Sequence, residues 1–165
     1  MIIDNVRKVQ TRIAAACGRV GRDPASVTLV AVTKGRPLED ILQVIDAGIF
    51  DIGENKVKEA AAKYESVCRH APAGRAVRWH MIGHLQTNKA KDAVRIFDLI
   101  HSVDSLRVAQ EIDKQASKIR KVQDILIEVK TSPEATKYGV DPKELPALAS
   151  AIRHLENLRL QGLMT

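Results

Sequence analysis

The sequence predicts an α/β protein in which a parallel sheet curves into a TIM-type barrel, and three observations lead to that fold class. Short apolar segments alternate with amphipathic ones along most of the chain. The apolar segments are nearly continuous, as expected for strands covered on both faces of a parallel sheet. No glycine-rich GxGxxG or GxxxxGKS loop follows the first of them, which favours a barrel over a doubly wound nucleotide-binding sheet.

An amphipathic helix precedes this alternation. Apolar residues recur at helical spacing from Ile3 to Val20, and Gly21 with the pair Asp23-Pro24 ends the segment. We expect a helix of about twenty residues here, as an N-terminal addition to the barrel.

The repeating units then follow in order. Strands are expected at residues 28–34, 49–55, 78–85, 97–104, 123–131 and 158–165. Helices are expected at 36–48, at 56–69, at 86–96, after Asp104 or Ser105, and after the turn 141–144. An eight-stranded barrel generally takes about 200 residues or more. Residues 1–165 are therefore expected to form one incomplete barrel domain with about six of eight strands.

Composition excludes several other classes of protein. The chain is 45% hydrophobic and 28% charged, which is the profile of a globular domain rather than of a disordered or fibrous chain. No apolar run approaches the ~20 residues that cross a bilayer, and we expect neither a signal peptide nor a membrane partner. The two cysteines, Cys17 and Cys68, form no CxxC pair, so that neither a disulfide framework nor a zinc site is expected. These features favour a cytoplasmic protein.

The net charge of +6 leaves two kinds of partner open. A basic nucleic-acid-binding module is one alternative, but aromatic residues make up only 3% of the chain and the basic residues are dispersed. A small anionic ligand fits the charge equally well. We therefore expect no nucleic acid and a small-molecule ligand instead.

Lys34 is the first candidate site residue, because it closes the apolar run "VTLVAVTK" at the carboxyl end of a predicted strand. In parallel α/β folds this end of the sheet carries the active site. A strand-ending lysine commonly just reaches water. If Leu29, Ala31 and Val32 wall it in, however, its ammonium form is disfavoured and the amine can attack a carbonyl, as a Schiff-base lysine does.

Six motifs, in order along the chain, resemble the pyridoxal phosphate (PLP) homeostasis protein family. They are "AVTK" at 31–34, "DIGENKVKEA" at 51–60, "WHMIGHLQTNK" at 79–89, "IHSVDS" at 100–105, "SPEATKYGV" at 132–140 and "LQGLMT" at 160–165. That family is similar to the barrel domain of alanine racemase. The resemblance implies that Lys34 carries PLP as a Schiff base, with Asn55 close to the ring and Met164 at the floor of the pocket.

The function that the resemblance implies is a non-catalytic PLP carrier whose partners are PLP-dependent client enzymes. A PLP-dependent racemase or decarboxylase is the alternative. Racemases of this fold use a second base, a tyrosine from an added domain, and Tyr64 and Tyr138 show no sign of that role in the sequence. The loops that grip the phosphate in the family lie beyond the last motif, so the resemblance also implies a partial barrel without its phosphate cup.

A metal site is the last possibility, because His80 and His84 are spaced to share one face of a strand. No Cys, Asp or Glu completes a ligand set beside them in the sequence, and we expect no metal.

Overall fold

The computed structural model describes residues 1–132 and 138–165. Its centre is a parallel sheet of six strands in the order β1-β2-β3-β4-β5-β6. The strands are β1 (Ala31–Val32), β2 (Asp51–Glu54), β3 (Arg78–Met81), β4 (Leu99–Val103), β5 (Gln123–Glu128) and β6 (Leu158–Met164). Sequential strands that lie side by side, each reached through a helical crossover, give the TIM-barrel-like arrangement that the sequence predicts.

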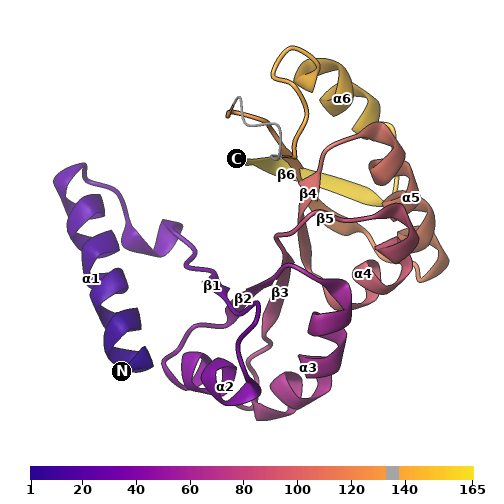
Figure 1. The fold of residues 1–165 in the computed structure, drawn as a ribbon. Helices are drawn as coiled ribbons and strands as arrows, with labels where there is room; N and C mark the ends of the chain where they lie inside the picture. Colours follow the sequence, from indigo (N-terminus) through magenta and orange to yellow (C-terminus); the bar gives the residue numbers. More distant parts are fainter. Residues whose placement is uncertain (133–137) are drawn as a thin grey trace.

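Helices alternate with these strands. They are α1 (Ile2–Arg19), α2 (Leu38–Asp46), α3 (Val57–His70), α4 (Ala90–Ile96), α5 (Leu106–Lys118) and α6 (Leu145–Ile152), with 3₁₀ turns η1 (Pro24–Ser26) and η2 (Thr87–Lys89). Figure 1 shows α2 to α6 along the outer side of the curved sheet, while α1 stands beside the β1 end. The expected N-terminal helix and the expected order of elements are confirmed.

The core lies between the sheet and its outer helices. Alternate residues of each strand face those helices, and Ile52, Trp79, Ile100 and Ile125 are buried almost completely. Trp79 shows that these side chains point toward the helices, because its ring lies 5.4 Å from the ring of Tyr64 on α3. Residues next to these in each strand therefore face the inner side of the curve.

The strands are shorter than the sequence indicates. β1 has two residues where 28–34 was expected, and β3 ends at Met81 rather than at residue 85. The cause in β1 is its place at the edge of the sheet, since it pairs only with β2 and the apolar residues before it have no partner strand. An apolar run predicts burial, but strand assignment also requires paired backbone groups.

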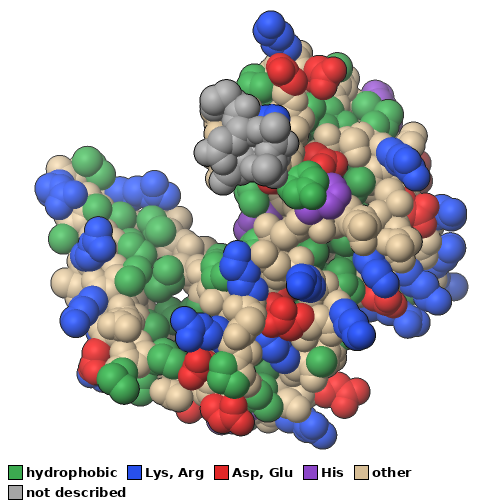
Figure 2. Space-filling model, viewed as in Figure 1, with side chains coloured by type: hydrophobic (Ala, Val, Ile, Leu, Met, Phe, Trp, Pro, Cys, Tyr) green, Lys and Arg blue, Asp and Glu red, His purple; other side chains and the backbone are tan. Residues whose placement is uncertain are grey.

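The carboxyl ends of the strands meet along one edge of the sheet, where most of the family motifs lie. Residues 133–137 of the "SPEATKYGV" motif lie outside the described residues. Figure 2 shows Lys and Arg side chains scattered among Asp and Glu on the face in view. Every helix in the described part of the chain is too short or too polar to span a bilayer.

Candidate functional site

Lys34 lies in the turn after β1, at the carboxyl edge of the sheet, as the sequence predicts. Its side chain is exposed, and within the described part of the chain its ammonium group has no hydrogen-bond or ion-pair partner. The three residues that could have walled it in do not do so among the described residues: Leu29 and Ala31 are only half-buried, and Val32 is 53% exposed. An edge strand has one neighbour, so its other side stays open to water.

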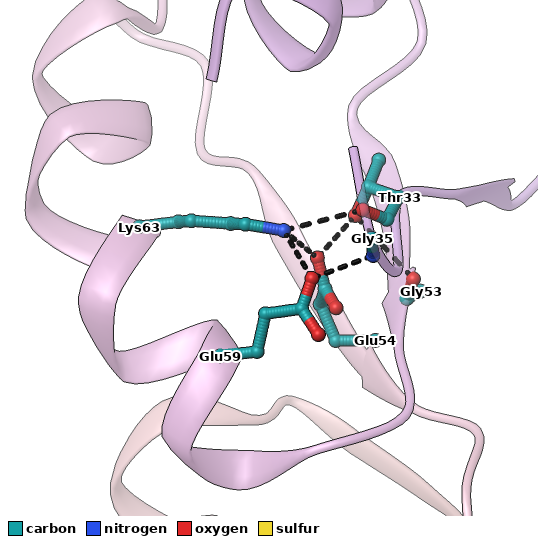
Figure 3. Close-up of polar contacts among 6 residues, drawn as sticks. All are labelled: Thr33, Gly35, Gly53, Glu54, Glu59 and Lys63. Atoms are coloured by element: carbon teal, nitrogen blue, oxygen red, sulfur yellow. Dashed lines mark hydrogen bonds and ion pairs between the residues drawn. The ribbon is translucent and has the colours of Figure 1, made fainter. Parts of the chain in front are cut away.

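The backbone on both sides of Lys34 is held by helix α3 (Figure 3). Lys63 Nζ donates to the carbonyl oxygen of Thr33 at 3.2 Å. The Gly35 amide donates to Glu59 Oε1 at 2.6 Å. Gly35 has φ +67°, a left-handed conformation that glycine adopts without a Cβ penalty. The turn that carries Lys34 is thus tied to α3 through its two flanking peptide groups.

The tie depends on an ion triad of Glu54, Lys63 and Glu59. Lys63 Nζ lies 2.9 Å from Glu54 Oε1 and 2.8 Å from Glu59 Oε1. The Glu54 side chain is fully buried, and those of Lys63 and Glu59 are 14% and 28% exposed. Glu54 Oε1 also accepts a hydrogen bond from the buried Thr33 hydroxyl at 2.8 Å. The triad therefore joins the β1 turn, β2 and α3 at one point.

Glu59 and Lys63 are both held in their charged forms. The hydrogen bond from Lys63, followed by that from the Gly35 amide, lowers the pKa of Glu59. Burial alone lowers the pKa of Lys63, but the hydrogen bonds to Glu59 and Glu54 outweigh burial and raise that pKa overall. Each of these two charges thus stabilises the other, while Glu54 Oε2 is buried without a hydrogen-bond partner among the described residues.

Sequence reasoning missed these three residues, although two signals pointed to them. Glu54 is an acidic residue in the predicted strand 49–55, and a charge that is buried in a strand needs a partner. Glu59 and Lys63 have the i, i+4 spacing that brings side chains together on a helix. Neither signal reveals that both side chains reach the turn after β1.

Asn55 follows β2 directly and is half-buried beside Gly83. A Cβ at position 83 would lie 2.8 Å from Asn55 Cα and would clash with the Asn55 carbonyl oxygen. Both residues line a pocket of about 450 Å³. Its lining also includes Lys56, Lys58, Lys89, His84 and Tyr138. Three lysines without a carboxylate among the described lining residues give this pocket a positive charge.

Tyr138 lies in the same pocket. Its ring stacks on His84 with 3.9 Å between the ring centres. His84 Nδ1 in turn lies 3.4 Å from Asp104 Oδ2. Burial, followed by the charge of Asp104, raises the pKa of the neighbouring Glu128. The carboxyl edge therefore contains groups that are able to exchange protons.

His80 and His84 do not share a face, contrary to the sequence analysis, because β3 ends at Met81 and the strand alternation stops there. His80 instead faces the inner side of the sheet, where its Nδ1 lies 2.8 Å from His101 Nε2 and its Nε2 lies 2.9 Å from Asp51 Oδ1. Among residues 1–132 and 138–165, no group of three or more His, Cys, Asp or Glu is arranged to hold a metal ion.

Met164 ends β6 and is half-buried. The described sheet has β1 and β6 at opposite edges, with β2 to β5 between them, so Met164 does not lie beside Lys34. Asn55, by contrast, follows the strand next to β1. Lys130, beyond β5, is held through its amide, which donates to the Val140 carbonyl oxygen at 2.9 Å. The roles of Lys34, Asn55 and Met164 in binding remain predictions.

A parallel, helix-covered sheet with a lysine at the end of its first strand defines the class of protein: the alanine racemase N-terminal domain family, which matches residues 3–165. A PLP homeostasis protein of Pseudomonas aeruginosa is 40% identical over 163 residues, which are 99% of this chain and 69% of that protein. The chain belongs to the PLP homeostasis protein family.

Solved structures agree with this assignment. A protein of Bifidobacterium adolescentis has a TM-score of 0.92 and 39% identity, and the match covers 99% of this chain and 68% of that one. PipY of Synechococcus elongatus, solved with PLP bound, has a TM-score of 0.83 and 32% identity, with 99% and 69% of the two chains covered.

Proposed function

We propose that this protein binds PLP reversibly through a Schiff base on Lys34 and releases it, unchanged, to PLP-dependent client enzymes. The observation that carries the proposal is the exposed Lys34 amine on a backbone turn tied to α3, at the carboxyl edge of a sheet like that of PipY, which was solved with PLP bound. A carrier needs a reachable amine rather than a sealed one, because the ligand has to enter and leave.

The residues at this edge fit the aldehyde end of PLP. Lys34 has no competing partner within the described part of the chain, so its deprotonated amine is free to attack the aldehyde carbon. A carbon–nitrogen bond forms, and the aldehyde oxygen leaves as water. Asn55, from the adjacent strand, is proposed as a polar contact for the ring, and Met164 as an apolar one.

Borohydride trapping tests the attachment. PLP is added, the imine is reduced, and the modified peptide is identified by mass spectrometry. We expect the visible-edge absorbance band to disappear on reduction and the label to lie on Lys34. Lys34→Ala is expected to abolish the label, whereas Lys91→Ala, at an exposed position of α4, is expected to keep it. A label on another lysine, or none, contradicts the proposal.

A PLP-dependent amino-acid racemase is the second candidate, and the stacked pair His84–Tyr138 near Asp104 is the observation that favours it. We expect the carrier to be correct and predict no exchange of the Cα hydrogen of alanine, serine or arginine for deuterium in PLP-loaded protein. Proton exchange that is lost in both Lys34→Ala and His84→Asn would establish the enzyme instead, because it needs both the amine and the base.

A further inference from the structure

The contacts around Lys34 hold its backbone rather than its side chain. The carbonyl oxygen of Thr33 belongs to the peptide bond before Lys34, and the amide of Gly35 belongs to the peptide bond after it. Lys63 donates to the first at 3.2 Å, and Glu59 accepts from the second at 2.6 Å. When both peptide planes are fixed, the direction of the Lys34 Cα–Cβ bond is fixed as well.

We propose that Glu59 and Lys63 are positioning residues, which hold the turn so that the Lys34 amine faces its ligand before the ligand arrives. This inference rests on the proposed function, since it assumes that Lys34 is the attachment point. Neither residue is proposed to touch the ligand. Their effect is on the Lys34 backbone, to which both are hydrogen-bonded through the adjacent residues (Figure 3).

Glu54 makes this arrangement rigid. Its side chain is fully buried on β2, and Oε1 contacts both Lys63 Nζ at 2.9 Å and the Thr33 hydroxyl at 2.8 Å. The Thr33 amide also donates to the Gly53 carbonyl oxygen at 2.9 Å, as in a sheet. The helix is therefore anchored to the strand next to β1, and the turn cannot swing away without breaking its hydrogen bonds to Glu54, Glu59 and Lys63.

The expected size of the effect follows from backbone entropy. A free turn has to lose the freedom of about one residue when the ligand attaches, whereas a held turn has lost it during folding. Restricting one residue corresponds to about a tenfold change in affinity, or ~1.4 kcal/mol. Removing the acceptor for the Gly35 amide is thus expected to weaken PLP binding about tenfold.

Three substitutions on α3 separate positioning from a general effect on the helix. Glu59→Ala removes the acceptor for the Gly35 amide, whereas Glu59→Gln keeps an acceptor oxygen and removes only the charge. Glu65→Ala is the matched control, because Glu65 is exposed on the same helix. Lys63 is left unchanged, since its removal would strand the buried Glu54 carboxylate and unfold the protein for unrelated reasons.

The experiment measures PLP affinity from the imine absorbance band and, without ligand, the hydrogen–deuterium exchange of the Gly35 amide by NMR. We expect Glu59→Ala to weaken binding about tenfold and to accelerate exchange at Gly35. Glu59→Gln is expected to restore most of the PLP affinity and most of the slow exchange at Gly35. Glu65→Ala is expected to change neither the affinity nor the exchange rate. A structural role alone would lower thermal stability but leave the affinity of the folded protein equal to that of Glu65→Ala.

Two results overturn the inference in distinguishable ways. If wild-type protein carries the trapped label on Lys34 but Glu59→Ala binds PLP as tightly as Glu65→Ala does, the positioning role is wrong and the proposed function stands. If wild-type protein carries no label on Lys34, the proposed function fails and the positioning role fails with it.

Discussion

The stability of the protein is expected to fall as the pH drops from 6.5 toward 4, because of His101 on the inner side of the sheet. Burial, followed by the charge of His80, lowers the pKa of His101 from 6.5 to about 4. As the pH falls, the unfolded chain therefore takes up a proton on His101 before the folded protein does. The unfolding free energy that depends on a neutral His101 is therefore fully present above pH 6.5 and is lost as the pH approaches 4.

The magnitude follows from the difference between the two pKa values. At ~1.4 kcal/mol per pH unit, the gap between 6.5 and about 4 corresponds to at most ~3.5 kcal/mol of unfolding free energy. His101 is only half-buried, and solvent screening reduces this limit, so we expect a loss of about 1–2 kcal/mol. His80 Nε2 donates to Asp51 Oδ1 at 2.9 Å, and His80 Nδ1 lies 2.8 Å from His101 Nε2.

Urea denaturation of wild type, His101→Gln and His154→Gln, from about pH 7.5 to about pH 4.5, measures this loss. Glutamine places its amide group near the position of the imidazole Nε2, and because an amide can both donate and accept, a hydrogen bond to His80 is retained. Carboxylates titrate alike in all three proteins, and their effect cancels in the comparison. We expect the loss in wild type and in the control at exposed His154, and a smaller loss in His101→Gln. Equal losses in all three proteins would refute the reasoning.

Two further predictions concern packing and buried hydrogen bonds. Gly83→Ala is expected to lower the unfolding free energy by about 1–3 kcal/mol in urea denaturation, because the new Cβ meets the Asn55 backbone. Gly18→Ala in α1 is the control. Its Cβ has open space, so this change is expected to be neutral or stabilising. Lys121→Met is expected to lower the unfolding free energy by about 1–3 kcal/mol, since Lys121 Nζ donates to the carbonyl oxygens of Val94 and Phe97 at 2.8 and 2.7 Å. Lys91→Met, at an exposed position, is the control. Equal urea midpoints for the two variants would contradict the role of Lys121.

Much of the fold was predictable because it depends on local pattern. The alternation of apolar and amphipathic segments gives the order of strands and helices, and the crossover rule then gives a parallel sheet with sequential neighbours. Strand ends were less predictable. The apolar segment before Ala31 has no partner strand, and β3 ends where Gly83 packs against Asn55. Both features depend on contacts between segments that are distant in the sequence.

The candidate site was predictable in position but not in its supporting contacts. Lys34 was found because strand ends on one edge of a parallel sheet gather functional groups. The interior pair of His80 and Asp51 was missed, since 29 positions separate them in the sequence. The pairing of His84 with Tyr138 was missed for the same reason: each was considered with its sequence neighbours, although the two rings stack across different segments.

Of the two interpretations of Lys34 that the sequence left open, the structure favours the lysine that reaches water, and this changes the chemical argument. In "VTLVAVTK" the buried polar residue is Thr33, at 3% exposure, while Lys34 turns outward into solvent. The described residues therefore form no apolar enclosure around the Lys34 side chain. What the fold supplies instead is a fixed backbone, through contacts from Glu59 and Lys63. A fixed and solvent-accessible amine supports the proposal of reversible attachment, because water can reach the proposed imine and hydrolyse it.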